Sequence, residues 1–215
     1  MNSPNVTIID YGVGNLLSVS RGFEHHGVSV EVTRDPKKIL TSQRVVLPGV
    51  GAFPNAMQIL NKLNLVSVIQ ELASKGTPLL AICLGMQLIM EESEEFGITQ
   101  GIGLIPGRVV AIPREDIDGS RQKIPHIGWS SLNISNTNSS WGNTLLQETK
   151  PGGAVYFTHS FMAQPSDQRN QLAHAIYGGR KIPAVITKNQ ITGFQFHPEK
   201  SGTVGLKMLA RFIAQ

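Results

Sequence analysis

The only cysteine of the 215-residue chain, Cys83, follows the short apolar run 78–82. Such a run is typical of a strand that is buried on both faces of a sheet. Residues 84–95 are strong helix formers without a proline, so we expect a helix to begin directly after the cysteine. Cys83 would then occupy a sharp strand-to-helix turn, and the small residues Ala81 and Gly85 would let the backbones pass closely there.

A cysteine on such a turn could be a nucleophile. The stretch resembles the G-x-S-x-G nucleophile elbow, with Cys83 in place of serine and Ala81 in place of the first glycine. A helix N-terminus beside the sulfur favours the thiolate, which is the attacking species. The alternative is a structural thiol, since free cysteines are among the most buried residues. This stretch alone supports both interpretations equally.

The stretch 193–201 contains a candidate base. Pro198 favours an extended conformation for His197, and residues two apart in an extended chain point to the same side. Glu199 could then lie beside the imidazole, fix its tautomer and stabilise its charged form. His-Pro-Glu alone would indicate only a polar turn. Together with Cys83 upstream, it predicts a triad in the order Cys, His, Glu.

Gly49, Val50 and Gly51 follow another expected strand, 44–47. Acyl transfer needs backbone N–H groups aimed at the developing oxyanion, and the N–H of Leu84 would be one donor. A glycine-rich turn can present a second, because glycine lets the peptide rotate. A tight strand-to-helix turn is the structural interpretation, and the two are compatible.

The elements expected in the first half would position these residues. Strands alternate with helices, which predicts a largely parallel sheet with helices on both faces. Ligands on such sheets bind beyond the carboxyl ends of the strands. The turns after Asp10, after Leu47 and around Cys83 should therefore share one edge. The expected strands are 6–10, 28–33, 44–47 and 78–82, and the expected helices are 16–26, 36–40, 54–60 and 66–75.

After Gly107 the pattern changes to closely spaced strands, which predicts antiparallel hairpins added to the sheet. The polar stretch 133–153 is expected to be mostly surface loop around a short helix at Leu145 and Leu146, and a last helix should cover 203–213. Neither a repeat nor a linker stands out, so we expect a single domain over 1–215. The strand-like segments are 109–112, 123–129, 154–157, 172–177, 184–188 and 191–196.

Composition excludes several classes of protein. Hydrophobic residues at 40% and charged residues at 16% indicate a globular chain, and the net charge of +4 comes from scattered residues without the basic, aromatic clustering of a nucleic-acid surface. One cysteine excludes a disulfide framework. Without a signal peptide or an apolar run of ~20 residues, we expect a soluble cytoplasmic protein that binds no membrane. His25 and His26 precede Gly27 as a helix end would, so we expect no metal site there.

Two motifs carry a family resemblance. Cys-Leu-Gly-Met-Gln at 83–87 and Phe-His-Pro-Glu at 196–199 resemble the class I (triad) glutamine amidotransferases. Four stretches narrow the resemblance to the glutaminase subunits that supply ammonia to a cyclase of histidine biosynthesis. The similarity runs over nearly the whole chain and implies a three-layer, flavodoxin-like α/β fold with a mixed, largely parallel sheet. These stretches are 10–15, 47–53, 124–129 and 197–202.

The resemblance implies hydrolysis of L-glutamine to glutamate and ammonia without a cofactor or metal. Cys83 would attack the carboxamide, His197 would protonate the departing ammonia, and Glu199 would hold the imidazole. Gly49, Val50 and Leu84 would form the oxyanion hole. The glutamine pocket would be lined by Gly51, Gln87, Glu95, His159 and Ser160.

The family partner is a (β/α)8-barrel cyclase subunit, so the resemblance implies a heterodimer. Asn15, His126 and Trp129 lie in stretches expected near the interface, although a core role for Trp129 is equally compatible with the sequence. Ammonia released into water would be protonated and lost as a nucleophile, which is the physical reason for a closed interface and a channel.

The chain departs from the family pattern in places. Ser130 stands where asparagine is usual, Phe161 where tyrosine is common, and Pro54-Asn55 replaces Gly-Asp. These departures leave open a paralogous glutaminase subunit that feeds another synthase, such as one that amidates a surface sugar. A cysteine hydrolase on a similar scaffold is a further alternative. A catalytically inactive binding subunit is disfavoured, because all three triad residues are present.

Overall fold

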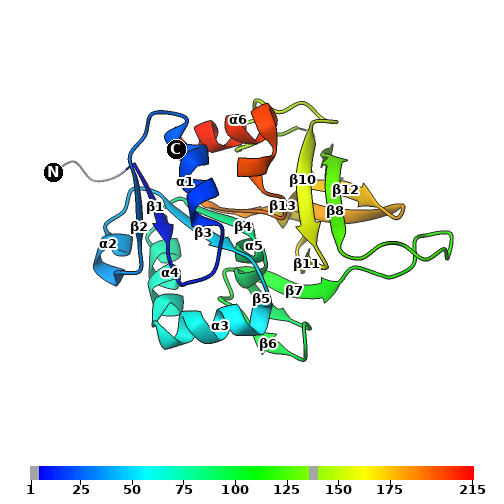
Figure 1. Ribbon diagram of the computed structural model, residues 1–215, viewed down its shortest axis with the longest axis horizontal. Helices are drawn as coiled ribbons and strands as arrows, with labels where there is room; N and C mark the ends of the chain where they lie inside the picture. Colours follow the sequence, from blue (N-terminus) through cyan, green and yellow to red (C-terminus); the bar gives the residue numbers. More distant parts are fainter. Residues whose placement is uncertain (1–4, 136–139) are drawn as a thin grey trace.

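The computed structural model describes residues 5–135 and 140–215. Its main feature is an eight-stranded sheet that runs in the order β2-β1-β3-β4-β14-β13-β12-β9 (Figure 1). The pairs from β2 to β14 are parallel, and those from β14 to β9 are antiparallel. The strands are β1 (Val6–Ile9), β2 (Val30–Thr33), β3 (Val45–Gly49), β4 (Leu79–Cys83), β9 (Asn133–Ile134), β12 (Gln171–Tyr177), β13 (Arg180–Lys188) and β14 (Ile191–Phe194).

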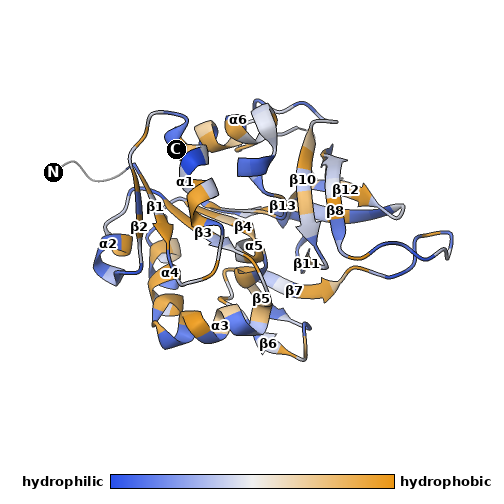
Figure 2. Cartoon of the chain, viewed as in Figure 1, coloured by the Kyte–Doolittle hydropathy of each residue, from blue (hydrophilic) through white to orange (hydrophobic). Residues whose placement is uncertain are grey.

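Helices cover both faces of the parallel part. Alternate residues of β4 enter different cores, because successive side chains in a strand point to opposite faces. Leu79 and Ala81 pack with the helices α3 (Phe53–Lys62) and α4 (Leu65–Ser74), whereas Leu80 and Ile82 pack on the side of α1 (Leu16–Glu24) and α6 (Gly202–Ile213). The short helix α2 (Pro36–Leu40) lies beside α4. The apolar colouring of β1 and α4 in Figure 2 follows from this burial. The expected three-layer α/β fold is confirmed.

The antiparallel strands expected after Gly107 are also present. β7 (Ile105–Ala111) pairs with β11 (Phe161–Pro165), and β8 (His126–Ser131) pairs with β10 (Ala154–His159). Two 3-10 helices, η1 (Gln168–Asn170) and η2 (Pro198–Lys200), complete this half. Because β13 and β14 continue the sheet that β1 and β3 form, we propose that residues 1–215 make one domain.

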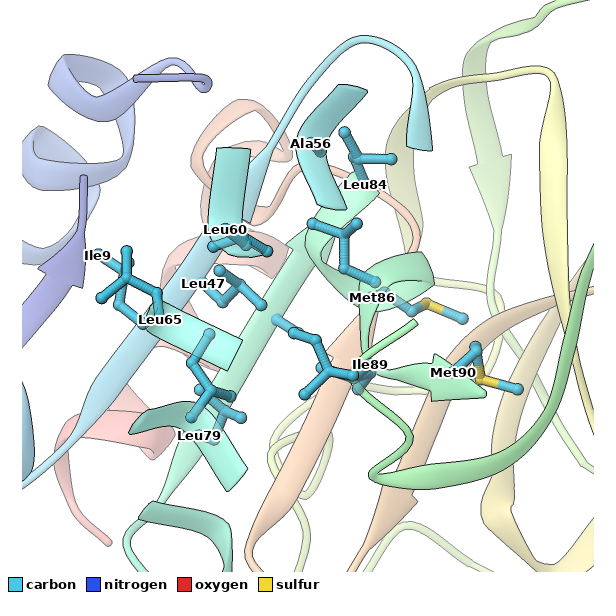
Figure 3. Packing of buried hydrophobic residues seen from close by; sticks show 14 of the residues in the cluster. Ile9, Leu47, Ala56, Leu60, Leu65, Leu79, Leu84, Met86, Ile89 and Met90 are labelled. Carbon is cyan, nitrogen blue, oxygen red and sulfur yellow. The ribbon is translucent and has the colours of Figure 1, made fainter. Parts of the chain in front are cut away.

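The helix expected over 84–95 is much shorter. The helix α5 ends at Leu88, and the chain continues as β5 (Met90–Ser93), which pairs with β7 and with β6 (Thr99–Gln100). Leu84, Met86 and Ile89 pack among residues of β3 and α3 (Figure 3). The expectation was wrong because strand pairing with segments farther along the chain overrides helix propensity.

The stretch 133–153 is held to the core more firmly than a surface loop would be. Trp141, Leu145 and Leu146 are buried in the cluster on the α1 and α6 side, and the indole Nε1 of Trp141 donates to the carbonyl of Leu172 at 3.1 Å. The expected helix at Leu145 and Leu146 is replaced by turns, and residues 136–139 lie outside the described part of the chain.

Within residues 5–135 and 140–215, every helix is too short or too polar to cross a lipid bilayer.

Candidate active site

Cys83 lies on the sharp turn that the sequence predicts. It is the last residue of β4, and α5 begins at Leu84, so the backbone of Cys83 takes a positive φ of 55° with ψ of −110°. Such a conformation is rare outside glycine and is typical of strained functional positions. The turn also brings α5 so close to β3 that a Cβ on Gly85 would overlap the carbonyl of Leu47. The glycine at 85 is therefore a steric requirement of the elbow.

His197 and Glu199 lie together, as expected from their spacing. His197 is extended (φ −98°, ψ 100°) before Pro198, and its Nδ1 is 2.8 Å from Oε1 of Glu199. Both side chains are buried. The backbone N–H of His197 donates to the carbonyl of Tyr156, and the hydroxyl of Ser201 donates to the carbonyl of His197. The imidazole is thus held by its carboxylate partner and by two backbone anchors.

Cys83 and Glu199 determine the charge state of His197. Burial by itself lowers the pKa of His197, but the Cys83 sulfur and the Glu199 carboxylate more than offset it and raise the pKa to about 10. The sulfur and the imidazole line the same cavity. A pair of thiolate and imidazolium is the state that such an arrangement favours.

We expect Glu199→Gln to lower kcat for glutamine by roughly 10³- to 10⁴-fold, by analogy with the loss of a carboxylate that orients a catalytic histidine. The uncharged amide would hold the ring less well and would lower the pKa of His197. Steady-state ammonia release measures the effect. Glu71→Gln, which removes a half-exposed carboxylate on α4, is the matched control and should leave the rate unchanged.

The same variant has a pH signature in stability. A raised histidine pKa stabilises the native state fully below the unfolded value of about 6.5, and this contribution is lost as the pH rises through the folded value of about 10. The free energy of unfolding of the wild type should therefore exceed that of Glu199→Gln most near pH 6, and the difference should shrink toward pH 10. Urea unfolding at pH 6, 8 and 10 measures it, and a constant difference would contradict the assigned charge state.

A cavity of about 320 Å³ opens onto the sulfur and the imidazole. This volume suits a small metabolite. All five residues expected to bind substrate line the cavity, and Leu84 and Val50 of the expected oxyanion hole line it as well. The five are Gly51, Gln87, Glu95, His159 and Ser160.

Glu95 is placed differently from the sequence expectation but reaches the same cavity. It follows β5 instead of ending a helix, and its backbone N–H donates to the hydroxyl of Ser93 at 3.1 Å. Its Oε2 accepts from the backbone N–H of Phe53, the first residue of α3, at 2.8 Å. The bond from Phe53 at the N-terminus of α3 therefore fixes the position of the Glu95 carboxyl group beside the cavity.

Gly49, the third residue of the expected oxyanion hole, is not among the residues that line the cavity. It pairs with Cys83 in the register of β3 and β4, and a Cβ at this position would meet the hydroxyl of Tyr11 at 2.6 Å. Val50 is 40% exposed, and Gly51 has a positive φ of 95°. The turn 49–51 is thus tightly packed at its first residue and open at the next two.

His159 belongs to a chain of hydrogen bonds that reaches His126. Burial lowers the pKa of His159 to about 3 and that of His126 to about 4, so both rings are neutral near pH 7. The Nδ1–H of His159 must donate to the carbonyl of Phe161 at 2.8 Å, so its Nε2 accepts from Nδ1–H of His126 at 3.1 Å. The hydroxyl of Ser130 then donates to Nε2 of His126 at 2.9 Å.

The three expected interface residues are placed differently from one another. Asn15 is exposed and caps α1, with its side chain accepting from the N–H of Ser18. Trp129 is 58% exposed and meets Tyr156 edge to face, so the alternative of a core role does not fit. His126 is buried and faces His159, so its side chain does not reach the surface.

Two contacts of the sulfur were missed in the sequence. The carbonyl of Thr158 lies 3.9 Å from Sγ of Cys83, and Nε2 of Gln195 lies 4.0 Å from it. A backbone carbonyl gives no sequence signal. Gln195 gives one, because it is a polar residue between Phe194 and Phe196 in a strand-like run, where a buried amide needs a specific partner.

In the described ranges, no group of three or more His, Cys, Asp or Glu side chains is arranged to hold a metal ion.

The fold and the sequence agree on a class of protein. The family model described as glutamine amidotransferase class-I matches residues 7–215. A solved glutamine amidotransferase superposes with a TM-score of 0.72 at 13% identity and covers 97% of both chains, and PurLQS from Thermotoga maritima superposes with a TM-score of 0.69 at 16% identity, with coverage of 99% of this chain and 98% of that chain. These identities support the fold alone. The family match shows that the chain belongs to the class-I glutamine amidotransferases.

Comparison with proteins of similar sequence identifies the family within this class. The chain is 47% identical over 209 residues to imidazole glycerol phosphate synthase subunit HisH 1 of Legionella pneumophila (strain Lens), with coverage of 97% of this chain and 98% of the relative. It is 44% identical over 207 residues to subunit HisH of Bacillus subtilis (strain 168), with coverage of 96% and 94%. Within the class, the chain is a member of the HisH family of imidazole glycerol phosphate synthase subunits, as the motifs at 10–15 and 124–129 indicate.

Proposed function

We propose that the chain hydrolyses L-glutamine to L-glutamate and ammonia and delivers the ammonia to the cyclase subunit of imidazole glycerol phosphate synthase. The observation that carries the proposal is the single cavity at which a strained cysteine, a buried His197–Glu199 pair and the carboxylate of Glu95 converge. The high identity to HisH subunits supports the same reaction.

In the first half of the reaction, the thiolate of Cys83 attacks the carboxamide carbon of glutamine. The negative charge that develops on the oxygen is stabilised by the backbone N–H groups of Leu84 and Val50, with Gly49 and Gly51 giving the turn its shape. The imidazolium of His197 donates its proton to the nitrogen, the C–N bond breaks, and ammonia leaves. The product on the enzyme is a γ-glutamyl thioester.

In the second half, His197 is neutral and accepts a proton from water as the water attacks the thioester. The tetrahedral intermediate forms at the same position and uses the same N–H donors. Its collapse expels the thiolate of Cys83 and releases glutamate, which restores the pair of thiolate and imidazolium. Glu199 keeps the Nδ1–H of His197 in place through both halves.

The cavity also accounts for recognition of an amino acid. Glu95 has one carboxylate oxygen bonded to the N–H of Phe53, and we assign its other oxygen to the α-ammonium of glutamine. Gln87, His159 at the end of β10, and Ser160 line the same cavity. The hydrogen bond from His159 to the carbonyl of Phe161 fixes the junction between β10 and β11 at Ser160.

The partner of the proposed heterodimer is a (β/α)8-barrel cyclase subunit. Exposed apolar side chains are expected at the site of contact, and Ile127 and Trp129 on β8 are 59% and 58% exposed. Asn15 follows β1 at the carboxyl edge of the eight-stranded sheet, whereas β8 belongs to the two-stranded sheet that it forms with β10. We assign Asn15, Ile127 and Trp129 to the interface. We assign to the buried His126 a structural role, because it holds β8 against the interior through its contact with His159.

Labelling with an electrophilic glutamine analogue tests the proposal. The analogue should modify Cys83 with a stoichiometry of one, glutamine should protect the thiol, and a simple amide such as acetamide should not. Mass analysis of the digested protein locates the label. Labelling that glutamine leaves unchanged would refute a glutamine pocket and would favour a different cysteine hydrolase.

We also expect the isolated chain to hydrolyse glutamine slowly and the ligand-loaded cyclase partner to raise kcat by roughly 10²- to 10³-fold. The reason is the open turn at Val50 and Gly51, because an oxyanion hole that lacks one donor loses about this factor. Ammonia release with and without the partner measures the ratio. A full rate from the isolated chain, unchanged by the partner, would show that the hole is complete at rest.

A further inference from the structure

Gln195 is a completely buried amide that the reaction described above does not use. It follows β14 directly, and its backbone N–H donates to the carbonyl of Ala184. The rings of its sequence neighbours Phe194 and Phe196 stack on each other with centroids 4.8 Å apart, so the Gln195 side chain, as the intervening residue of an extended chain, points to the other side. Burial of an amide without hydrogen bonds is costly. The hydrogen-bond partners of the Gln195 side-chain oxygen and nitrogen therefore indicate the role of this residue.

The orientation of the Gln195 amide follows from its neighbours. Nε2 of Gln87 lies 3.0 Å from the carbonyl oxygen of Phe161. A carbonyl only accepts, so the atom of Gln87 that faces it must be the nitrogen. The same nitrogen lies 3.2 Å from Oε1 of Gln195, which must accept. The nitrogen of Gln195 is left to face Sγ of Cys83 at 4.0 Å.

The sulfur needs such a donor. The helix α5 that follows Cys83 has only five residues, so the helix dipole that the sequence suggested contributes little. The carbonyl of Thr158, at 3.9 Å, is an acceptor and favours the protonated thiol. An N–H group favours the thiolate, because hydrogen bonds to charged atoms are stronger than hydrogen bonds between neutral groups.

We propose that Gln195 is a further catalytic residue, whose Nε2–H donates to the Cys83 sulfur and stabilises it as the thiolate, and that Gln87 positions the Gln195 amide for this contact. The proposal rests on the proposed function. The same contact serves twice, because the thiolate is the attacking group in the first half of the reaction and the leaving group in the second.

Other titratable groups lie around the sulfur. His197, which is bonded to Glu199, and Glu95 line the same cavity as the sulfur, and Tyr11 follows β1. Burial and the Cys83 sulfur raise the pKa of Tyr11, so its phenol stays neutral and adds no charge beside the sulfur. His197 supplies the charged partner, and Gln195 supplies a neutral donor that keeps its proton at every pH used in the test.

The test measures the rate at which iodoacetamide alkylates Cys83 in the full chain between pH 5 and 10. In Gln195→Met, which keeps the size and loses the donor, the pH at half-maximal rate should rise by about one to two units. Gln195→Glu should raise it further, because a carboxylate replaces the donor while still accepting from Gln87. At pH 7, kcat for glutamine should fall about 10- to 100-fold, with KM changed less than about threefold.

Gln70→Met is the matched control. It removes an amide that donates to the carbonyl of Ile102, away from the cavity, and should leave the alkylation profile and kcat unchanged. Thermal unfolding and near-UV circular dichroism identify variants that fold. If Gln195→Met does not fold, Gln195→Glu carries the test, because it preserves the shape of the side chain and the bond with Gln87.

The outcomes distinguish the role of Gln195 from the proposed glutaminase function. A folded Gln195 variant with the wild-type alkylation profile and the wild-type kcat would overturn the role of Gln195. A wild-type chain that releases no ammonia from glutamine, alone or with its partner, would overturn the proposed function, whereas its alkylation profile would still test the contact. A shifted profile together with a reduced kcat would support both.

Discussion

Replacing Cys83 with alanine is expected to lower glutamine-dependent ammonia release by at least about 10⁴-fold, as does removal of other enzyme nucleophiles. No other thiol exists in the chain, so no neighbouring sulfur can substitute. The buried His197–Glu199 pair would remain, but it would have no thiolate partner. Ammonia release with glutamine as substrate, measured on the complex with the partner, gives the effect.

The same variant should leave the partner's reaction intact when an ammonium salt is added. Alanine removes only the sulfur from a residue that ends β4, and because alanine carries the same Cβ as cysteine, the backbone strain at 83 is unchanged. Cys83→Ser, which keeps a polar atom of similar position, controls for packing. If both the glutamine-dependent and the ammonium-dependent reactions were lost, Cys83 would be structural and the triad would be refuted.

The edge of the sheet at which the site forms was predictable from short-range patterns. Apolar runs that end in glycine-bearing turns gave β1, β3 and β4, and parallel strands place their carboxyl ends together. The His-Pro-Glu spacing predicted the contact between His197 and Glu199, because proline restricts the backbone before it. In both cases the information lies within a few consecutive residues.

The extent of α5 was not predictable in this way. Residues 89–95 carry strong helix formers, yet 90–93 of them form β5, because Met90 and Ser93 pair with β7 and fill buried positions there. Pairing of this kind depends on residues that come later in the chain. The family resemblance therefore predicted correctly that Glu95 lines the cavity. Helix propensity predicted wrongly that Glu95 ends a helix.

The side-chain orientation on β8 shows a similar limit. The motif at 124–129 indicated an interface as a whole, but successive residues of a strand point to opposite sides. His126 points into the protein toward His159, while Ile127 and Trp129 are exposed. The motif predicted the segment, and only the pairing with β10 determined which of its residues face outward.

The second large effect is expected from Gly85→Ala, which should lower the free energy of unfolding by about 3 kcal/mol or more, as overpacking against rigid groups does. Gly85 lies in α5 without a positive φ, so helix propensity alone would favour alanine by about 1 kcal/mol. The cost is steric, because the new Cβ would overlap the carbonyl oxygen of Leu47 and lie 3.0 Å from its carbonyl carbon.

These two carbonyl atoms belong to the backbone of β3 and cannot rotate away, so relief requires α5 and β3 to separate. That movement would displace Cys83 at one end of the contact and Gly49 at the other, and the folded fraction should therefore lose glutamine hydrolysis as well. Gly142→Ala is the matched control, since Gly142 is exposed, has no positive φ and would place its Cβ no closer than 3.5 Å to Ser140. Urea unfolding of both variants gives the comparison. A Gly85→Ala protein as stable as the Gly142→Ala protein would mean that the elbow does not depend on the close approach of α5 to β3, and the placement of the sulfur would then need another cause.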